Sequence, residues 1–396
     1  MNKKFLIGTI GLLFLCLSSQ TLSSTPIPKG QLTIWVSVDK GYKGIAKVAA
    51  KFEQETGVKV TVDHFDQLTD RFERNASYGG GPDILLWAND RYGEWVKKEL
   101  LDEIDVPNGF KDRFFDVTWD AMSVNGKIYG YPFALEAISL ICNKDLVPHV
   151  PKTFEEFEQL DAKLAKQGKH AILWDYNNIY YSYPLISANG GYSFYRNEDG
   201  TYDTSNVGVN NEGTKTGLNY IIKMVNNGHM EKDVTYASME SQFIDGKIGC
   251  IITGAWGWRK YSNINYTVNE FPTLNGKAAK PFVGVLGLVI NKTTPNKDLA
   301  NKFLQEYLLT DEGYEEVNND ILLGASALIS YESKLEKDPR VVTLMANVKN
   351  GQLMPNIPEM YAFWSSLGSA FKSAISGKQS VDEALKTAEE RMLRHH

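Results

Sequence analysis

The feature that most constrains the fold is a short apolar run between a glycine-rich turn and a group of aromatic and charged residues. Residues 84–86 are aliphatic, follow the turn at 79–82 and precede Trp87, Asp90 and Arg91. An apolar run of this length, bounded by turn residues, is typical of a strand buried inside a parallel sheet. In open α/β sheets, ligands bind beyond the carboxyl ends of such strands. The segment therefore predicts an α/β fold with these three side chains at a ligand-binding edge.

The three side chains at this strand end suit the chemistry of a sugar ring. The indole of Trp87 offers a flat face to C–H groups, while Asp90 and Arg91 offer an acceptor and a planar donor fork to hydroxyls. The alternative interpretation is a core tryptophan, a helix-capping aspartate and a surface arginine. The segment alone favours neither interpretation.

A predicted β-α-β unit leads to the same sheet edge. Residues 32–36 alternate apolar and polar, 45–52 carry apolar residues at helical spacing, and 58–62 alternate again. Such a unit implies a parallel pair of strands joined by a right-handed crossover. Asp39 and Lys40 follow the first strand and should therefore lie near the edge described above. A helix cap for Asp39 and a solvated surface charge for Lys40 are the alternatives.

Further candidate residues follow strand-like runs later in the chain. Glu136 stands among apolar residues of the β-rich run 127–146, where an unpaired carboxylate is costly to bury. It needs either a ligand or an internal partner. Aromatic residues crowd 175–184, and we expect one or two of these rings to face a cleft. Trp256 follows another strand, and Trp364 enters a helix after a proline-pinned loop.

The first 25 residues have the pattern of a secretory signal peptide. Two lysines precede the apolar stretch 5–17, and small residues follow it. The stretch is too short to span a membrane. We therefore expect the protein to be secreted, with cleavage between Ser18 and Thr25. A lipid anchor at Cys16 is not expected, because Leu15 rather than a small residue precedes it.

Composition excludes several functional classes. The formal charge is −6 and no basic stripe is present, so nucleic acid is a poor partner. Only Cys142 and Cys250 follow the predicted signal peptide, too few for a disulfide scaffold and without metal-ligand spacing. We expect two buried free thiols, although one bridge between them stays open. No metal and no cofactor are expected.

The length implies about two domains, joined by ordered strands because no low-complexity linker is present.

Several blocks of the chain resemble the maltose/maltodextrin-binding proteins, the periplasmic receptors of carbohydrate ABC importers. The blocks are LTIWVSVDKGY at 32–42, GPDILLWANDR at 81–91, KPFVGVL at 280–286, YLLTDEG at 307–313 and MPNIPEM at 354–360. The likeness runs colinearly from about Gly30 to Met392, which makes it far more specific than a short motif.

The resemblance implies a two-lobed periplasmic-binding-protein fold. Each lobe is a mixed α/β sheet flanked by helices, and the chain crosses between the lobes three times through a multi-strand hinge. Lobe 1 would comprise 26–135 and 286–334, and lobe 2 would comprise 136–285 and 335–396. The implied function is non-enzymatic: a monomer that binds maltose or maltodextrins in the cleft and delivers them to an inner-membrane ABC permease. A chemotaxis receptor is a further implied partner.

The resemblance also assigns ligand-binding residues by position. The polar clamp would be Asp39, Lys40, Asp90, Arg91 and Glu136; the aromatic platforms would be Trp87, Tyr180, Trp256 and Trp364; Met354 and Tyr236 would be peripheral; and Ala88, Asn178 and Tyr181 complete the set.

Three positions depart from the better-known members of that family. Asn178 and Thr69 stand where those members carry acidic residues, and Gly368 stands where they carry a basic one. These departures leave the preferred chain length and anomer open. They also leave open the alternative that a protein of the same fold binds another oligosaccharide or an inorganic ion. A second alternative is a secreted glycoside hydrolase with Asp90 and Glu136 as its carboxylate pair.

Overall fold

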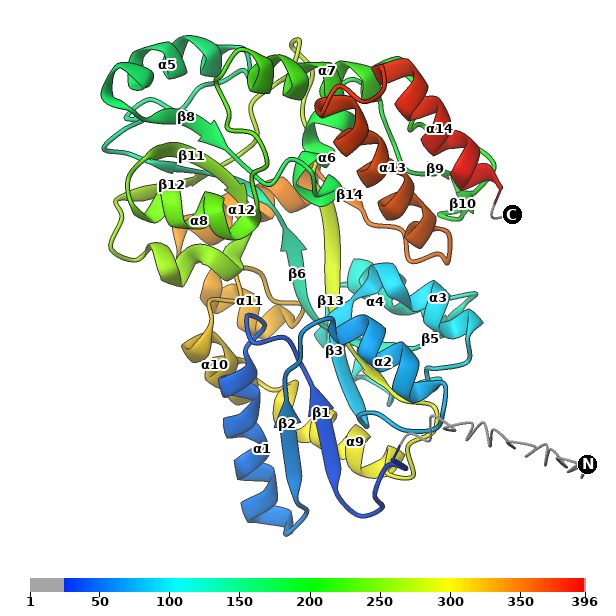
Figure 1. The fold of residues 1–396 in the computed structure, drawn as a ribbon. Helices are drawn as coiled ribbons and strands as arrows, with labels where there is room; N and C mark the ends of the chain where they lie inside the picture. Colours follow the sequence, from blue (N-terminus) through cyan, green and yellow to red (C-terminus); the bar gives the residue numbers. More distant parts are fainter. Residues whose placement is uncertain (1–24, 395–396) are drawn as a thin grey trace, which may run out of the picture.

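The computed structural model describes residues 25–394, so residues 1–24 of the predicted signal peptide, Cys16 among them, lie outside the described residues. Figure 1 shows two lobes joined by the long strands β6 (Gly130–Ala137) and β13 (Phe282–Ile290). The predicted two-lobed α/β architecture is confirmed. Within residues 25–394, no helix combines the length and the apolar character needed to cross a membrane.

The lower lobe in Figure 1 is built on a mixed sheet in the order β14-β13-β3-β1-β2, with β6 also paired to β13. Strand β1 runs parallel to β2 and β3, whereas β13 runs antiparallel to β3 and β6. The bounds of the remaining strands are β1 Leu32–Trp35, β2 Val60–Asp63, β3 Ile84–Ala88 and β14 Gln352–Leu353. The helices of this lobe are α1 Tyr42–Thr56, α2 Leu68–Ala76, α3 Tyr92–Lys97, α4 Asp116–Met122, α9 Lys297–Phe303, α10 Asp311–Asp320 and α11 Ile329–Leu335.

The predicted β-α-β unit is present as β1, α1 and β2. Helix α1 buries Ile45, Val48 and Phe52, the apolar positions that repeat at helical spacing. It ends at Gly57, whose φ of 74° lies in the left-handed region that glycine adopts without strain. The unit therefore places the chain after β1, including Asp39 and Lys40, at the edge where β3 also ends.

The upper lobe in Figure 1 has a second sheet in the order β12-β7-β11-β8. Strand β7 is antiparallel to β11 and β12, and β11 is parallel to β8. The strands are β7 Ser139–Asn143, β8 His170–Leu173, β11 Ile248–Thr253 and β12 Tyr266–Asn269. The helices are α5 Glu156–Leu164, α6 Ile179–Ala188, α7 Glu212–Asn226, α8 Tyr236–Ile244, α12 Pro339–Asn350, α13 Met360–Ile375 and α14 Val381–Leu393. Two small hairpins are also present, β4 Ser123–Val124 with β5 Lys127–Ile128, and β9 Tyr195–Arg196 with β10 Tyr202–Asp203.

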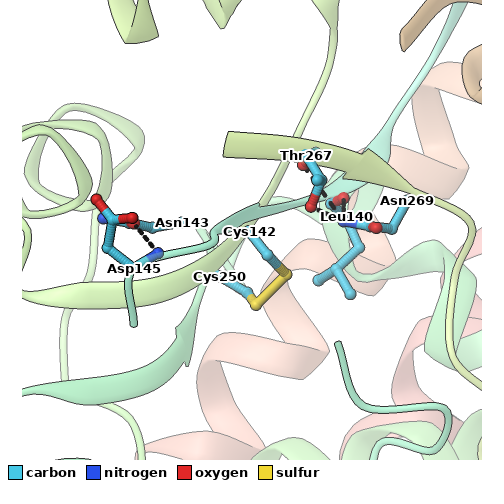
Figure 2. The surroundings of a disulfide bond; sticks show 7 residues. All are labelled: Leu140, Cys142, Asn143, Asp145, Cys250, Thr267 and Asn269. Atoms are coloured by element: carbon cyan, nitrogen blue, oxygen red, sulfur yellow. Dashed lines mark hydrogen bonds between the residues drawn. A yellow bond between two sulfur atoms is a disulfide. The ribbon is translucent and has the colours of Figure 1, made fainter. Parts of the chain in front are cut away.

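Cys142 and Cys250 form a disulfide in the upper sheet (Figure 2). The expectation of two free thiols is wrong. The two cysteines lie directly opposite each other on the antiparallel strands β7 and β11, with Cα atoms 4.1 Å apart. Both side chains are fully buried. Strand register brings the sulfur atoms together, and register between segments more than a hundred residues apart is not visible in the sequence.

Two glycines on the connecting strand β13 provide space for neighbouring side chains. A Cβ at Gly287 would lie 2.3 Å from the sulfur of Met122, and a Cβ at Gly284 would lie 3.2 Å from Cε of Met354. Glycine is the residue that permits such close approach of a backbone to its neighbours. The glycines therefore let lobe 1 and the segment around Met354 pack directly against the strand that joins the lobes.

Candidate ligand-binding site

A cavity of about 500 Å³ lies between the lobes. Lobe 1 contributes the segments that follow β1 and β3, the strands β6 and β13 contribute the floor, and lobe 2 contributes the start of α6, Trp256 and helix α13. The predicted site residues that line the cavity are Asp39, Lys40, Trp87, Ala88, Asp90, Glu136, Asn178, Tyr180, Tyr181, Trp256, Met354 and Trp364. The structure thus brings together residues from segments far apart in the sequence.

An ion pair beneath an indole forms one part of the cavity wall. The Lys40 ammonium contacts the Glu136 carboxylate, and Nζ lies 4.4 Å from the centroid of the Trp256 ring. Glu136 therefore has the internal partner that a carboxylate among apolar residues needs. Its side chain still lines the cavity, so pairing with Lys40 leaves it available to a ligand. Lys40 is not the freely solvated surface charge of the alternative interpretation.

Asp90 and Trp364 make a hydrogen bond across the cleft. The indole Nε1 of Trp364 donates to Oδ2 of Asp90 over 3.2 Å. Burial raises the pKa of Asp90 to about 6, and the charge of Arg91 and the indole hydrogen bond limit the rise. Asp90 lies in the 3-10 turn Asn89–Arg91 and is not an N-cap, because Ala88 has that position for the turn and Arg91 for α3. Its carboxylate is therefore a cavity group that titrates near neutral pH.

Asn89 is a positioning residue that the sequence analysis missed. Its side chain is fully buried beside the cavity. The amide nitrogen donates to the carbonyl of Met354 over 2.8 Å, and the amide oxygen accepts from the backbone N–H of Val285 over 2.9 Å. These bonds tie the end of β3 to β13 and to the segment after β14. Asn89 thereby fixes the position of Trp87 and Asp90 on either side of it.

The aromatic residues of lobe 2 form a connected wall. The rings of Tyr180 and Trp256 lie 6.4 Å apart at 33°, and Tyr181 stacks on Tyr236 with centroids 5.6 Å apart. Tyr236 does not line the cavity; its hydroxyl accepts from Nε1 of Trp256 over 3.0 Å and bonds Thr253 over 2.9 Å. It therefore supports Trp256 from behind. Burial, followed by the charges of Glu136 and Asp90, raises the pKa of Tyr180 well above its usual value.

Arg91 does not line the cavity. Its guanidinium lies 3.2 Å from the Glu94 carboxylate, 3.6 Å from Glu73 and 3.7 Å from Asp70. Acidic side chains on α2 and α3 therefore hold the guanidinium away from the place where a ligand would lie. Its charge still acts on the neighbouring Asp90. Direct ligand contact by Arg91 stays a prediction.

The remaining predicted polar residues have distinct roles. Asn178 is the N-cap of α6, where its side-chain oxygen accepts from the backbone N–H of Tyr180 over 3.1 Å. Asp39 is exposed and does not cap α1, whose N-cap is Gly41. The cavity also has lining residues that the sequence analysis did not assign to the site, namely Leu86, Asn177, Ile179, Gly284, Leu286 and Gly368. Within residues 25–394, no cluster of histidine, cysteine and acidic side chains is arranged to hold a metal ion.

Two lobes with a ligand-sized cavity between them are the architecture of solute-binding proteins. Residues 47–341 match the family of bacterial extracellular solute-binding proteins, and the chain belongs to that family. The match confirms the family-level resemblance that the sequence blocks indicated.

Related proteins align with almost the entire chain. The galactooligosaccharide-binding protein of Bacillus subtilis is 31% identical, covering 96% of this chain and 94% of its own. A maltooligosaccharide ABC transporter solute-binding lipoprotein of Streptococcus pneumoniae is 31% identical over 98% of this chain and 97% of its own. A maltodextrin-binding protein of Bacillus subtilis is 30% identical over 98% and 96%. By their names, these relatives are binding proteins rather than enzymes.

Proposed function

We propose that this protein binds maltose and maltodextrins between its lobes and delivers them to an ABC permease in the inner membrane. The observation that carries the proposal is the cavity to which both lobes contribute aromatic rings and carboxylates. Relatives named for maltooligosaccharide and maltodextrin binding support this choice of ligand.

The cavity offers each face of a glucose unit a suitable partner. The rings of Trp256, Tyr180 and Trp364 present flat apolar surfaces to the C–H faces of the sugar. The carboxylates of Asp90 and Glu136 accept hydrogen bonds from sugar hydroxyls, and each such charged bond contributes roughly 1.5–3 kcal/mol. No bond of the ligand needs to change for this arrangement to work.

Binding is coupled to closure because the contacts come from both lobes. A ligand between Asp90 on lobe 1 and Trp256 on lobe 2 makes all of its contacts only when the lobes are close together. That difference in affinity shifts the equilibrium toward the closed state. We propose lobe 1 as 26–135 with 286–334 and lobe 2 as 136–285 with 335–396, so that β6 and β13 form the hinge. The permease would recognise the closed form.

We propose that the protein is a non-enzymatic monomer of the periplasm. The predicted signal peptide would be removed between Ser18 and Thr25, without a lipid anchor at Cys16, and a chemotaxis receptor would be a further partner. Hydrolysis by Asp90 and Glu136 is disfavoured because the related proteins are named as binding proteins. Incubation with maltotetraose should therefore release no reducing sugar.

A panel of ligands tests the proposed function by melting shift. Any ligand that binds the native state raises the melting temperature. Maltose, maltotriose and maltohexaose should raise it, whereas inorganic phosphate should not. A galacto-oligosaccharide belongs in the panel as the second candidate, because the Bacillus subtilis relative is named for that ligand and Asn178 and Gly368 depart from the maltose-binding pattern. A shift with the galacto-oligosaccharide alone would reject maltodextrins as the cargo.

A further inference from the structure

The interlobe cavity has an open side at Gly368. This residue lines the cavity on helix α13, one turn after Trp364. A Cβ placed there would meet only Cγ1 of Ile179, at 4.0 Å. A larger side chain at this position would therefore extend into open space. Because the residue is glycine, no side chain closes the cavity here.

A second cavity of about 430 Å³ is lined in part by the last turn of the same helix. Asn177 lines both cavities. Lys372 lines the second one and follows Gly368 by four residues on α13, so the two residues share a helix face. They are separated by about 6 Å along the helix axis. The two cavities are thus neighbours along one face of α13.

We propose that the second cavity is an extension subsite, which takes the additional glucose units of a malto-oligosaccharide whose first units fill the interlobe cavity. The proposal rests on the proposed function and deepens it, because it makes long maltodextrins the preferred cargo. The class of ligand follows from Asn177, which lines both cavities, and from the polar groups around the second cavity.

The chemistry of the second cavity suits sugar hydroxyls. Asn177 and Asn226 offer amides that donate and accept, Lys372 offers an ammonium donor, and Asp233 offers an acceptor. Tyr176 also lines the cavity, but it is buried and its hydroxyl donates to the carbonyl of Glu231 over 2.8 Å. We therefore expect hydrogen bonds rather than ring stacking to hold the additional units.

The position of the subsite determines what it does to closure. Its lining residues lie at 176–177, 225–233 and 372–378, all of them within the proposed lobe 2. Contacts confined to one lobe are the same in the open and the closed states. A ligand shifts a conformational equilibrium only by its difference in affinity for the two states. The extension therefore increases affinity for long chains without increasing the degree of closure.

Calorimetric titration with maltose, maltotriose and maltohexaose tests this inference. We expect the unaltered protein to bind maltohexaose at least about threefold more tightly than maltotriose. The Lys372→Ala and Asn226→Ala double variant should lose this preference and keep its affinity for maltose. Lys386→Ala, which removes an exposed lysine from the neighbouring α14, should change neither affinity.

Two results would overturn the inference and leave the proposed function standing. One is equal affinity of the unaltered protein for maltotriose and maltohexaose. The other is a double variant that keeps the full preference for maltohexaose while its melting temperature shows that it is folded. Absence of binding by all three sugars would instead reject the proposed function, and the extension subsite with it.

Discussion

Opposing influences act on the carboxyl group of Asp90. Burial between the lobes disfavours the charged form, whereas the indole of Trp364 and the charge of Arg91 favour it. The resulting pKa of about 6 means that a change of one or two pH units changes the charge of Asp90 substantially. A sugar hydroxyl that donates to Asp90 needs the charged carboxylate, so binding and deprotonation favour each other.

Ligand affinity should consequently depend on pH. As the pH falls through about 6, Asp90 takes up a proton and loses acceptor capacity. If only the charged form binds, maltotriose should bind about tenfold more weakly at pH 5 than at pH 7.5. Calorimetry at the two pH values measures this difference. Asp90→Asn should bind more weakly and lose most of the pH dependence. Equal affinity at both pH values would show that Asp90 does not bind the ligand as a carboxylate.

Trp364 should contribute directly to affinity. Its ring lines the cavity and its Nε1 donates across the cleft. Trp364→Ala should therefore weaken maltotriose binding by more than about 1 kcal/mol, as expected for a buried aromatic contact. Ser369→Ala, at an exposed position of the same helix, is the matched control and should have no effect. An unchanged affinity in a folded Trp364→Ala protein would mean that the indole serves only packing.

Some residues of the cavity could be placed from the sequence, and others could not. Trp87 and Asp90 could be placed at the sheet edge because they follow a recognisable buried strand. The direction of Arg91 could not be predicted, since it depends on acidic residues of α2 and α3 packed nearby. Asn89 carries no signal of its own in the sequence, and Gly368 contributes by lacking a side chain. The bonds of Asn89 and the open space beside Gly368 become visible only when the surrounding segments are in place.

At the level of elements, periodicity was enough to locate most strands and helices. The apolar runs 248–253 and 282–290 coincide with the strands β11 and β13, and the helix before Gly57 ends where glycine permits. The apolar stretch 299–309 does not form one continuous α-helix, because α9 ends at Phe303 and a π-helical turn, Leu304–Leu308, follows. Periodicity does not distinguish a π turn from an α turn. It also gives no register between distant strands, and so it missed the disulfide.

The disulfide should stabilise lobe 2. It joins cysteines 108 residues apart, and a crosslink over so long a segment restricts the unfolded chain strongly. The Cys142→Ala and Cys250→Ala double variant should lower the free energy of unfolding by about 2–4 kcal/mol, as measured by urea denaturation. Its affinity for maltotriose should stay the same, because neither cysteine lines the cavity. Identical urea midpoints for the two proteins would contradict a stabilising role.

For the whole molecule, the cavity exists only because two lobes meet across a hinge. Lys40 reaches Trp256 and Asp90 reaches Trp364, so each cross-cleft contact joins lobe 1 to lobe 2. Ligand between these groups should hold the lobes together. We expect small-angle X-ray scattering to show a smaller radius of gyration with saturating maltotriose than without ligand. A radius that stays constant while calorimetry shows binding would exclude ligand-induced closure.

We propose that a malto-oligosaccharide lies between the lobes, where rings and carboxylates from both lobes hold it. A crystal structure of the protein with maltotriose shows whether it does. We expect electron density for the sugar in the interlobe cavity, in contact with Asp90, Glu136, Trp256 and Trp364. An empty interlobe cavity, or sugar bound elsewhere on the protein, would reject the proposed site.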